Sequence, residues 1–321
     1  MALRSYIVKR LVYAIPLVFA MIIVNFTLVQ VAPGDPVAML VGEEGLANED
    51  LVRSIRERFG LDKPLHEQLY LYVIGVLQGD LGYSMVYNAK VLDIILARLQ
   101  ASAILWVSAI FIATAIGVAL GVFASRKPYS IEDNIMMTGA VVGFSMPVFW
   151  LGQLLILGFA LYLNLLPAGG IKSFTANVNP VQDTLIHLIL PATTLAISHM
   201  AVIARLTRGK MLDTIGQDYV ITARAKGLDE RTILFKHVLR NALLPVTTII
   251  GYRFVWILMG TVLVEIVFGW PGTGKLMFDS LARRDYPLLM GTFLILSLFV
   301  IIVNLVVDIL YAFIDPRVKY E

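Results

Sequence analysis

The heptapeptide GWPGTGK at 269–275 has the G-x-x-x-x-G-K spacing of a loop that binds nucleotide phosphates. In such a loop the Lys reaches the phosphates, and a Ser or Thr directly after it ligates Mg²⁺. Here Leu276 follows the Lys, and an apolar stretch long enough for a membrane helix, rather than a strand, precedes the motif. We therefore interpret the heptapeptide as a Gly/Pro turn and not as a nucleotide site.

Other catalytic chemistry has little support. The chain has no Cys, which excludes a thiol nucleophile, a thiolate metal site and a disulfide scaffold. Neither H-E-x-x-H nor G-x-S-x-G occurs. The four His residues are scattered without metal-ligand spacing: His66, His187, His199 and His237. We expect no catalytic residue and no metal site in this chain.

Two acidic residues, Glu265 and Asp308, fall near the ends of apolar stretches, and Arg253 lies in the middle of one. A carrier driven by protons or sodium usually needs more ionisable or ligating groups near the middle of the membrane. A central Arg costs at least about 2.5–3.5 kcal/mol, so Arg253 should face protein or water. Two interpretations stay open: an intramembrane pair of Arg253 with Asp308, or a place for Arg253 on a substrate path, opposite an anionic group.

The composition is that of a membrane protein. Of 321 residues, 58% are hydrophobic and 15% charged, against about 25% charged in soluble domains. These values exclude a soluble globular, a disordered and a collagen-like protein. A membrane helix needs about 20 apolar residues, and six stretches qualify: 11–31, 99–124, 135–163, 185–206, 243–268 and 288–313. Internal Pro residues predict kinks in some of them: Pro16, Pro147 and Pro191.

The distribution of Lys and Arg predicts the orientation of the chain. With six spans both termini lie on one side, and this side carries more than half of the Lys and Arg residues, eight of them between Arg205 and Arg240. By the positive-inside rule, both termini and the 210–242 loop are cytoplasmic. The sequence thus predicts an all-α, multi-pass protein of the cell membrane.

A long external loop, about residues 33–98, should contain two helices. Asn48 can cap the first helix, which Gly60 would end. Asp62 can open the second, with Pro64 in its first turn. This region is either a cap packed on the membrane helices or a docking surface for an external partner.

The loop on the other side, residues 210–245, predicts a helix, a Gly stop and a second helix. Met211, Ile215 and Tyr219 would share one face of the first helix, which Gly227 ends, and Asp229 would cap the second. Ala223, Ala225 and Gly227 are small, so another surface can approach the backbone closely. A basic loop on anionic lipid accounts for the charge alone, whereas a rigid element presented to a cytoplasmic partner also accounts for the two helices.

This loop resembles the coupling loop of ABC-type import permeases, E-A-A-x3-G-x9-I-x-L-P. In register on Gly227, only Ala223, Gly227 and Leu239 match the general form, but DYVITARAKGL and HVLRNALLP resemble the variant of the dipeptide/oligopeptide/nickel permease class. The likeness extends over the whole chain: APGDP at 32–36, FGLDKPL at 59–65, GDLGYS at 79–84, MPVFWLG at 146–152, RLTRGKML at 205–212, VEIVFGWPGTGKL at 264–276, RRDYPL at 283–288 and DPRVK at 315–319.

The resemblance implies the type I ABC importer permease fold with six transmembrane helices, and the long external loop indicates the first permease subunit of the class. It implies a second homologous permease, two cytoplasmic ABC ATPases that use ATP and Mg, and an extracytoplasmic substrate-binding protein as partners. This chain would bind no cofactor itself. The residues that would couple it to an ATPase are Asp218, Tyr219, Thr222, Ala223, Arg224, Ala225, Lys226, Gly227 and Leu228. Arg253 is a departure, because many relatives should have an uncharged polar residue there.

We therefore expect three parts: residues 1–97, the first helix with the external cap region; 98–313, a five-helix core with the coupling loop at 210–242; and 314–321, a cytoplasmic tail. Peptides are the expected cargo, with nickel and oligosaccharides as alternatives. The competing classes are a self-sufficient secondary carrier or channel and a membrane scaffold without transport.

Overall fold

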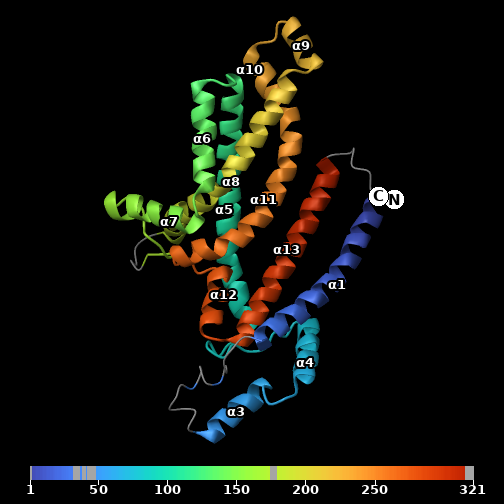
Figure 1. The fold of residues 1–321 in the computed structure, drawn as a ribbon, viewed down its shortest axis with the longest axis vertical. Coiled ribbons are helices and arrows are strands. Elements are labelled where there is room, and N and C mark those ends of the chain that lie inside the picture. The colour runs from blue at the N-terminus through green and yellow to red at the C-terminus, as the bar shows by residue number, and fades with distance from the viewer. Residues whose placement is uncertain (1, 32–36, 38–40, 42–47, 174–178, 315–321) are drawn as a thin grey trace. The chain divides into compact units, whose positions relative to one another are not determined.

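The computed structural model describes residues 2–31, 37, 41, 48–173 and 179–314, and it is an all-α structure (Figure 1). The described residues form two compact units, each drawn from two separate segments. One lies within Met1–Ala101 and Gly272–Ile302, and the other within Ser102–Pro271 and Val303–Lys319. Every element named among the described residues is a helix, which confirms the expected all-α class.

The first unit contains α1 (Ala2–Val31), α3 (Glu49–Phe59), α4 (Leu65–Gln78), the start of α5 (Val91–Arg126), α12 (Thr273–Ala282) and the start of α13 (Tyr286–Ile314). Its main apolar core draws on both segments, with the buried side chains Ile22, Leu81, Val91, Ile95, Leu276, Leu288 and Leu294. Because these residues are far apart in sequence, the core holds the two segments together.

A buried carboxylate makes a polar connection within the same unit. Asp285 accepts hydrogen bonds from the hydroxyl of Ser84 and from the backbone N–H groups of Met85 (3.2 Å) and Val86 (3.1 Å). These donors compensate for the desolvation of the carboxylate, which is 1% exposed. Asp285 thus fixes the turn before α5 against the turn before α13.

The two helices predicted within residues 33–98 are present. Asn48 caps α3 through its side chain, which accepts from the N–H of Leu51 at 3.1 Å, and Gly60 ends the helix at φ 66°. This part of the prediction is confirmed. The predicted start of the second helix at Asp62, with Pro64 in its first turn, is wrong, because α4 begins at Leu65 and Pro64 takes the capping position.

The second unit contains most of α5, then α6 (Ile131–Ser145), α7 (Val148–Leu155), η1 (Ile156–Tyr162), α8 (Pro180–Ile215), α9 (Asp218–Ala225), α10 (Glu230–Thr232), η2 (Ile233–Val238), α11 (Leu239–Val267) and the end of α13. Helix α8 is central: it packs on α6, α7 and α11, and more than half of its apolar stretch is buried. Helices α9 and α10 lie at the end of this unit where α5 ends and α6 begins (Figure 1).

Helices α5 and α8 approach each other closely at Gly117 and Gly121. A Cβ on Gly121 would lie 2.5 Å from the Cβ of Thr207 and 2.7 Å from the carbonyl oxygen of Ala204. Small residues four apart allow such close contact between membrane helices. The sequence contains this G-x-x-x-G spacing, but the spacing alone does not indicate which helix packs against it.

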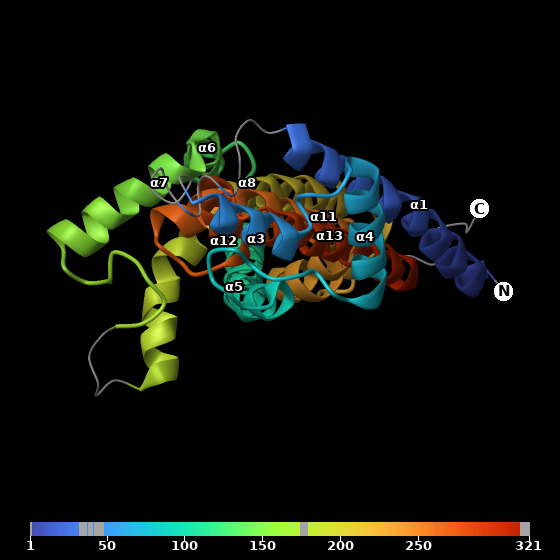
Figure 2. The same cartoon turned by 90° about the horizontal axis from the view of Figure 1, so that it is seen from below.

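The stretch 135–163, predicted as one span, is broken. Helices α6 and α7 meet at 106°, and α7 with η1 runs off to one side of α6 (Figures 1 and 2). Pro147 has no N–H to continue the helix, and Met146 before it is extended at φ −76° and ψ 136°. The predicted continuous helix is wrong there, although a Pro kink was expected at Pro147.

In the part of the chain that the structure describes, four helices are long and apolar enough to cross a membrane. They are α5, α8, α11 with the segment before it, and α13. The bent pair of α6 with α7–η1 would make a fifth span. Within the described residues, the apolar part of α1 is the shorter stretch Val12–Thr27. Length and composition thus support a multi-pass membrane protein.

Candidate functional site

The segment between α8 and α11, residues 216–238, is called the α9–η2 loop below. The predicted order of helix, Gly turn and helix is confirmed, but the start of the first helix is not. Met211 and Ile215 belong to α8, which ends before Gly216, and Tyr219 belongs to the separate helix α9. Gln217 is extended at φ −80° and ψ 148°, which turns the chain between the two helices.

Helix α9 is anchored along one face. Val220 (0% exposed) and Ala223 (7%) pack in a core with residues from four neighbouring elements: Val122 of α5, Met211 of α8, Ile233 and Val238 of η2 and Ala242 of α11. Interior packing of this kind resists displacement of one element alone. A force on α9 would therefore be transmitted to α5, α8 and α11.

Polar contacts close the turn after α9. Gly227 has φ 75°, in the left-handed region that favours Gly, and its N–H donates to the carbonyl of Arg224 at 2.9 Å. Across this turn the guanidinium of Arg224 binds both carboxylate oxygens of Glu230, at 2.7 and 3.2 Å. The hydrogen bond to Glu230 raises the pKa of Arg224. The turn is thus held by backbone and side-chain bonds together.

Capping orders the start of the second helix, as predicted. The carboxylate of Asp229 accepts from the N–H of Thr232 at 2.9 Å. Hydrogen bonds with Thr232 lower the pKa of Asp229, so the cap stays ionised at neutral pH. Tyr219 adds a further tie, because its hydroxyl donates to the carbonyl of His237 at 3.3 Å and accepts from Asn241 at 2.8 Å.

The opposite face of the loop is exposed. Of the residues expected to couple to an ATPase, only Ala223 is buried, and the rest are exposed: Asp218, Tyr219, Thr222, Arg224, Ala225, Lys226, Gly227 and Leu228. Ile221, which we did not predict, is 56% exposed beside them. Ile221 and Leu228 (41% exposed) put apolar side chains among the basic ones. A surface that mixes exposed apolar and basic side chains suits contact with a protein partner better than contact with water alone.

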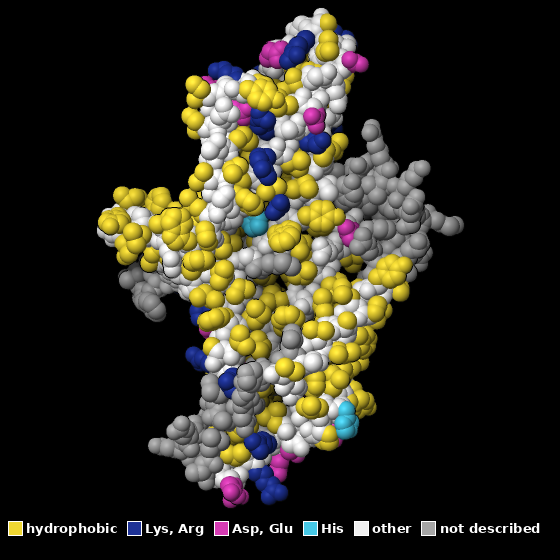
Figure 3. Space-filling view, viewed as in Figure 1, with side chains coloured by type: hydrophobic (Ala, Val, Ile, Leu, Met, Phe, Trp, Pro, Cys, Tyr) yellow, Lys and Arg dark blue, Asp and Glu magenta, His cyan; other side chains and the backbone are white. Residues whose placement is uncertain are grey.

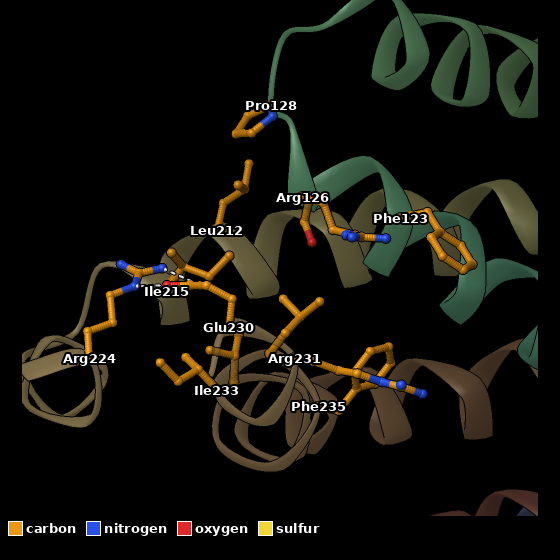
Figure 4. A pocket seen from close by; sticks show the side chains of 13 residues that line it. Phe123, Arg126, Pro128, Leu212, Ile215, Arg224, Glu230, Arg231, Ile233 and Phe235 are labelled. Carbon is orange, nitrogen blue, oxygen red and sulfur yellow. Dashed lines mark hydrogen bonds and ion pairs between the residues drawn. The ribbon is translucent and has the colours of Figure 1, made fainter. Parts of the chain in front are cut away.

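A cavity of about 690 Å³ lies beside the loop (Figure 4). Its lining comes from the end of α5, the end of α8 and the segment 224–238, including Phe123, Arg126, Leu212, Arg231 and Phe235. In Figure 4, Arg224 and Glu230 pair on one side of the cavity, and Arg126 and Arg231 extend toward the side of Phe123. No motif or periodicity in the sequence indicates this cavity, because its lining comes from segments that are far apart in the chain.

Arg253 lies half-buried on α11, where its electrostatic neighbours on α8 are Arg205 and His199. The Nδ1 atom of His199 is buried and has no hydrogen-bond partner among the described residues. On the face shown in Figure 3, Lys and Arg side chains form a column over α8 and α11, with a His near its inner end. The pair of Arg253 with Asp308 stays a prediction.

The structure also places the other residues that were singled out in the sequence. Buried Glu265 accepts from the hydroxyl of Ser102 at 2.6 Å, and Trp106 donates to Thr261 one turn away at 2.8 Å. The heptapeptide at 269–275 forms a turn and the start of α12, where Lys275 contacts Asp279 at 2.8 Å. Within the part of the chain that the structure describes, no three His, Asp or Glu side chains group as a metal site.

Two family models match the chain. Residues 117–320 match "Binding-protein-dependent transport system inner membrane component", and residues 3–105 match the N-terminal part of membrane components of the same systems. Both the α9–η2 loop and Arg253 fall within the first match.

Curated relatives are similar over nearly their whole length. The dipeptide transport system permease protein DppB of Escherichia coli K12 is 39% identical, over 99% of both chains. The glutathione transport system permease protein GsiC of the same strain is 40% identical, again over 99% of both. The oligopeptide transport system permease protein AppB of Bacillus subtilis 168 is 39% identical over 99% of this chain and all of the relative.

The fold also resembles a solved one. A chain in the crystal structure of an amino acid ABC transporter superposes with a TM-score of 0.51 at 14% identity, covering 70% of this chain and 94% of that one. At this identity the likeness concerns the fold alone.

Proposed function

This chain belongs to the family of binding-protein-dependent transport system inner membrane components and is a permease subunit of an ABC importer; we propose that it imports di- and oligopeptides, driven by ATP. The observation that carries the proposal is the identity of 39–40% over almost the whole chain with permeases named for dipeptides, glutathione and oligopeptides. Nickel and oligosaccharides have no such support among these relatives. The ATP would be hydrolysed by partner subunits, not by this chain.

The proposed assembly contains this chain, a second homologous permease, two ABC ATPases and an external substrate-binding protein. The six apolar stretches are proposed as six spans, with α6 and α7–η1 together as the third and the apolar part of α1 as the first. Both termini and the α9–η2 loop would then be cytoplasmic, in agreement with the Lys and Arg distribution. The division at 1–97, 98–313 and 314–321 is part of the proposal. The separate family matches at 3–105 and 117–320 support its first boundary alone, because the second match continues through residues 314–320.

The α9–η2 loop is proposed as the lever that couples the permease to an ATPase. Its exposed face, from Asp218 to Leu228, would bind the ATPase. When ATP closes the ATPase dimer, α9 would move, and its buried face would carry the movement to α5, α8 and α11 through the core around Met211 and Val220. The rigid turn at Gly227 suits this role, because a flexible loop would absorb the displacement.

The first test is co-purification of the tagged chain from its native cells in mild detergents, with mass spectrometry of what elutes. We expect two P-loop ATPases and a second six-span permease. If the chain elutes alone or only with itself in several mild detergents, the importer assembly is contradicted, and ion flux in liposomes would then test the channel alternative.

Arg253 is proposed to line the substrate path, where it would meet an anionic group such as a peptide carboxylate. We expect Arg253→Gln to assemble normally but to weaken uptake of peptides with a free C-terminal carboxylate more than that of C-terminally amidated ones. Competition uptake assays with the two peptide forms measure this selectivity. Equal loss for both forms, with intact expression, would contradict the proposed contact.

A further inference from the structure

The cavity beside the α9–η2 loop combines cationic and apolar walls. Arg224 is neutralised by Glu230, so the excess charge comes from Arg126 and Arg231, for which the described residues provide no acidic partner. Both guanidinium groups extend to the side of the cavity where Phe123 lies (Figure 4). Phe123 and Phe235 are 51% and 47% exposed, so they offer apolar surface to an occupant.

The ends of the membrane helices indicate the depth at which the cavity lies in the membrane. Arg126 is the last residue of the apolar helix α5, and Phe123 lies one helical turn before it, about 4.5 Å closer to the apolar interior. At the same end, Asp133 in the first turn of α6 binds Arg208 of α8 at 2.7 Å, and Arg208 covers the ring of Tyr129 at 5.5 Å. Charged and aromatic residues gather where helices leave the hydrocarbon, so the cavity spans the boundary between acyl chains and headgroups.

We propose that this cavity binds one anionic phospholipid of the cytoplasmic leaflet, with the phosphate on Arg126 and Arg231 and an acyl chain on Phe123 and Phe235. The cytoplasmic assignment rests on the orientation given in the proposed function. Guanidinium groups match phosphate oxygens in bidentate geometry, and basic pockets between membrane helices on this side suit anionic headgroups. A free phosphate would use the two Arg residues but would leave the aromatic walls exposed.

Bound lipid would act on the lever. The cavity is lined from α5 and α8 on one side and from Arg231 to Val238 of the loop on the other, so an occupant bridges the membrane helices and the α9–η2 loop. Its headgroup would offset the repulsion between two like charges, which otherwise favours opening of the cavity. The lipid would thus hold the loop against the ends of the membrane helices.

The test uses the complete transporter with its partners, purified in mild detergent and titrated with phosphatidylglycerol or phosphatidylcholine while native mass spectrometry counts bound lipid. We expect phosphatidylglycerol to bind more tightly and Arg126→Gln/Arg231→Gln to lower its affinity about tenfold or more. The matched control is Lys236→Gln/Arg240→Gln, which removes the same charge at exposed positions that do not line the cavity. It should leave the affinity within about twofold, since diffuse surface attraction is weak.

Four results would overturn the lipid site. Equal losses of affinity in both double variants would indicate diffuse attraction, and equal binding of the two lipids would show no preference for an anionic headgroup. Displacement of the lipid by millimolar inorganic phosphate would indicate a free-anion site. Lipid binding only after the ATPases are removed would indicate that an ATPase fills the cavity. Arg126→Gln alone, outside the loop, repeats the test if the double variant assembles poorly. Co-elution of the ATPases and peptide uptake are scored on the same preparations, so failure of the lipid site is distinguishable from failure of the proposed function.

Discussion

At the scale of single residues, the most constrained position of the proposed lever is Gly227. Its φ of 75° is costly for most side chains, although Asn and Asp tolerate this region better than others. Nothing lies within 4 Å of the position that a Cβ would take. The fold of the single chain therefore leaves room for a side chain at position 227. A partner that binds this surface would collide with that side chain.

We expect Gly227→Asp to abolish uptake and co-elution of the ATPases while the protein still inserts in the membrane. The added carboxylate would project from the surface where the ATPase is proposed to bind. Gly216→Asp is the matched control: Gly216 lies in the same loop with open space around it but at an ordinary φ of −80°. Normal uptake by Gly227→Asp, or equal damage from both variants, would contradict the lever assignment; uptake and membrane abundance are measured together.

At the scale of elements, the contact of α5 with α8 determines how movement of the loop reaches the membrane helices. The small side of α5 at Gly117 and Gly121 brings it within van der Waals distance of the α8 backbone at Met200 and Ala204. Dispersion between closely packed surfaces, rather than the hydrophobic effect, drives association of helices in lipid. Loss of this contact should therefore weaken both stability and coupling.

We expect Gly121→Ala to lower the free energy of unfolding by about 1–3 kcal/mol, because the methyl group would overlap the backbone of α8 and Thr207. Gly139→Ala in α6 is the control, since no atom lies within 4 Å of its Cβ position and Ala favours a helix over Gly. Thermal unfolding in detergent, followed by loss of monodisperse protein, compares the two. A Gly121→Ala variant as stable as Gly139→Ala would show that the close approach contributes little.

At the scale of the whole molecule, the chain has a proposed lever and proposed spans, and we propose that partner subunits drive the transport. No three His, Asp or Glu side chains cluster as a metal site within the described residues, and the buried carboxylate of Glu265 accepts a hydrogen bond from Ser102. The exposed apolar side chains of α6 and α7–η1 include Phe144, Trp150, Leu154 and Leu161, and Figure 3 shows hydrophobic atoms gathered over these helices. They provide an apolar surface for lipid or for the proposed second permease.

We therefore expect liposomes with this chain alone to take up no peptide, and liposomes with both permeases, the ATPases, the binding protein and ATP to do so. Under the proposed function, energy from ATP hydrolysis would reach the cargo only through the assembled subunits. Uptake of labelled dipeptide measures the difference, with a hydrolysis-deficient ATPase as control. Uptake by the chain alone would indicate a self-sufficient carrier.

The membrane class, the family and several local features could be predicted from the amino-acid sequence. Long apolar stretches must be helical in lipid because backbone groups there have no water to bond. The caps at Asn48 and Asp229 and the stop at Gly227 were also predictable, since each depends on bonds between neighbours in sequence. The family follows from many short motifs occurring together.

Four features became visible only in the folded chain: the sharp bend at Met146, the separation of α9 from α8, the α5–α8 approach at Gly121 and the cavity between Arg126 and Arg231. A Pro in an apolar stretch is compatible with either a kink or a break, and the neighbouring helices select between them. The cavity walls come from segments about a hundred residues apart, so no periodicity or short motif records their meeting. Contacts of this kind depend on how the helices pack, and no short stretch of the sequence specifies which helices meet.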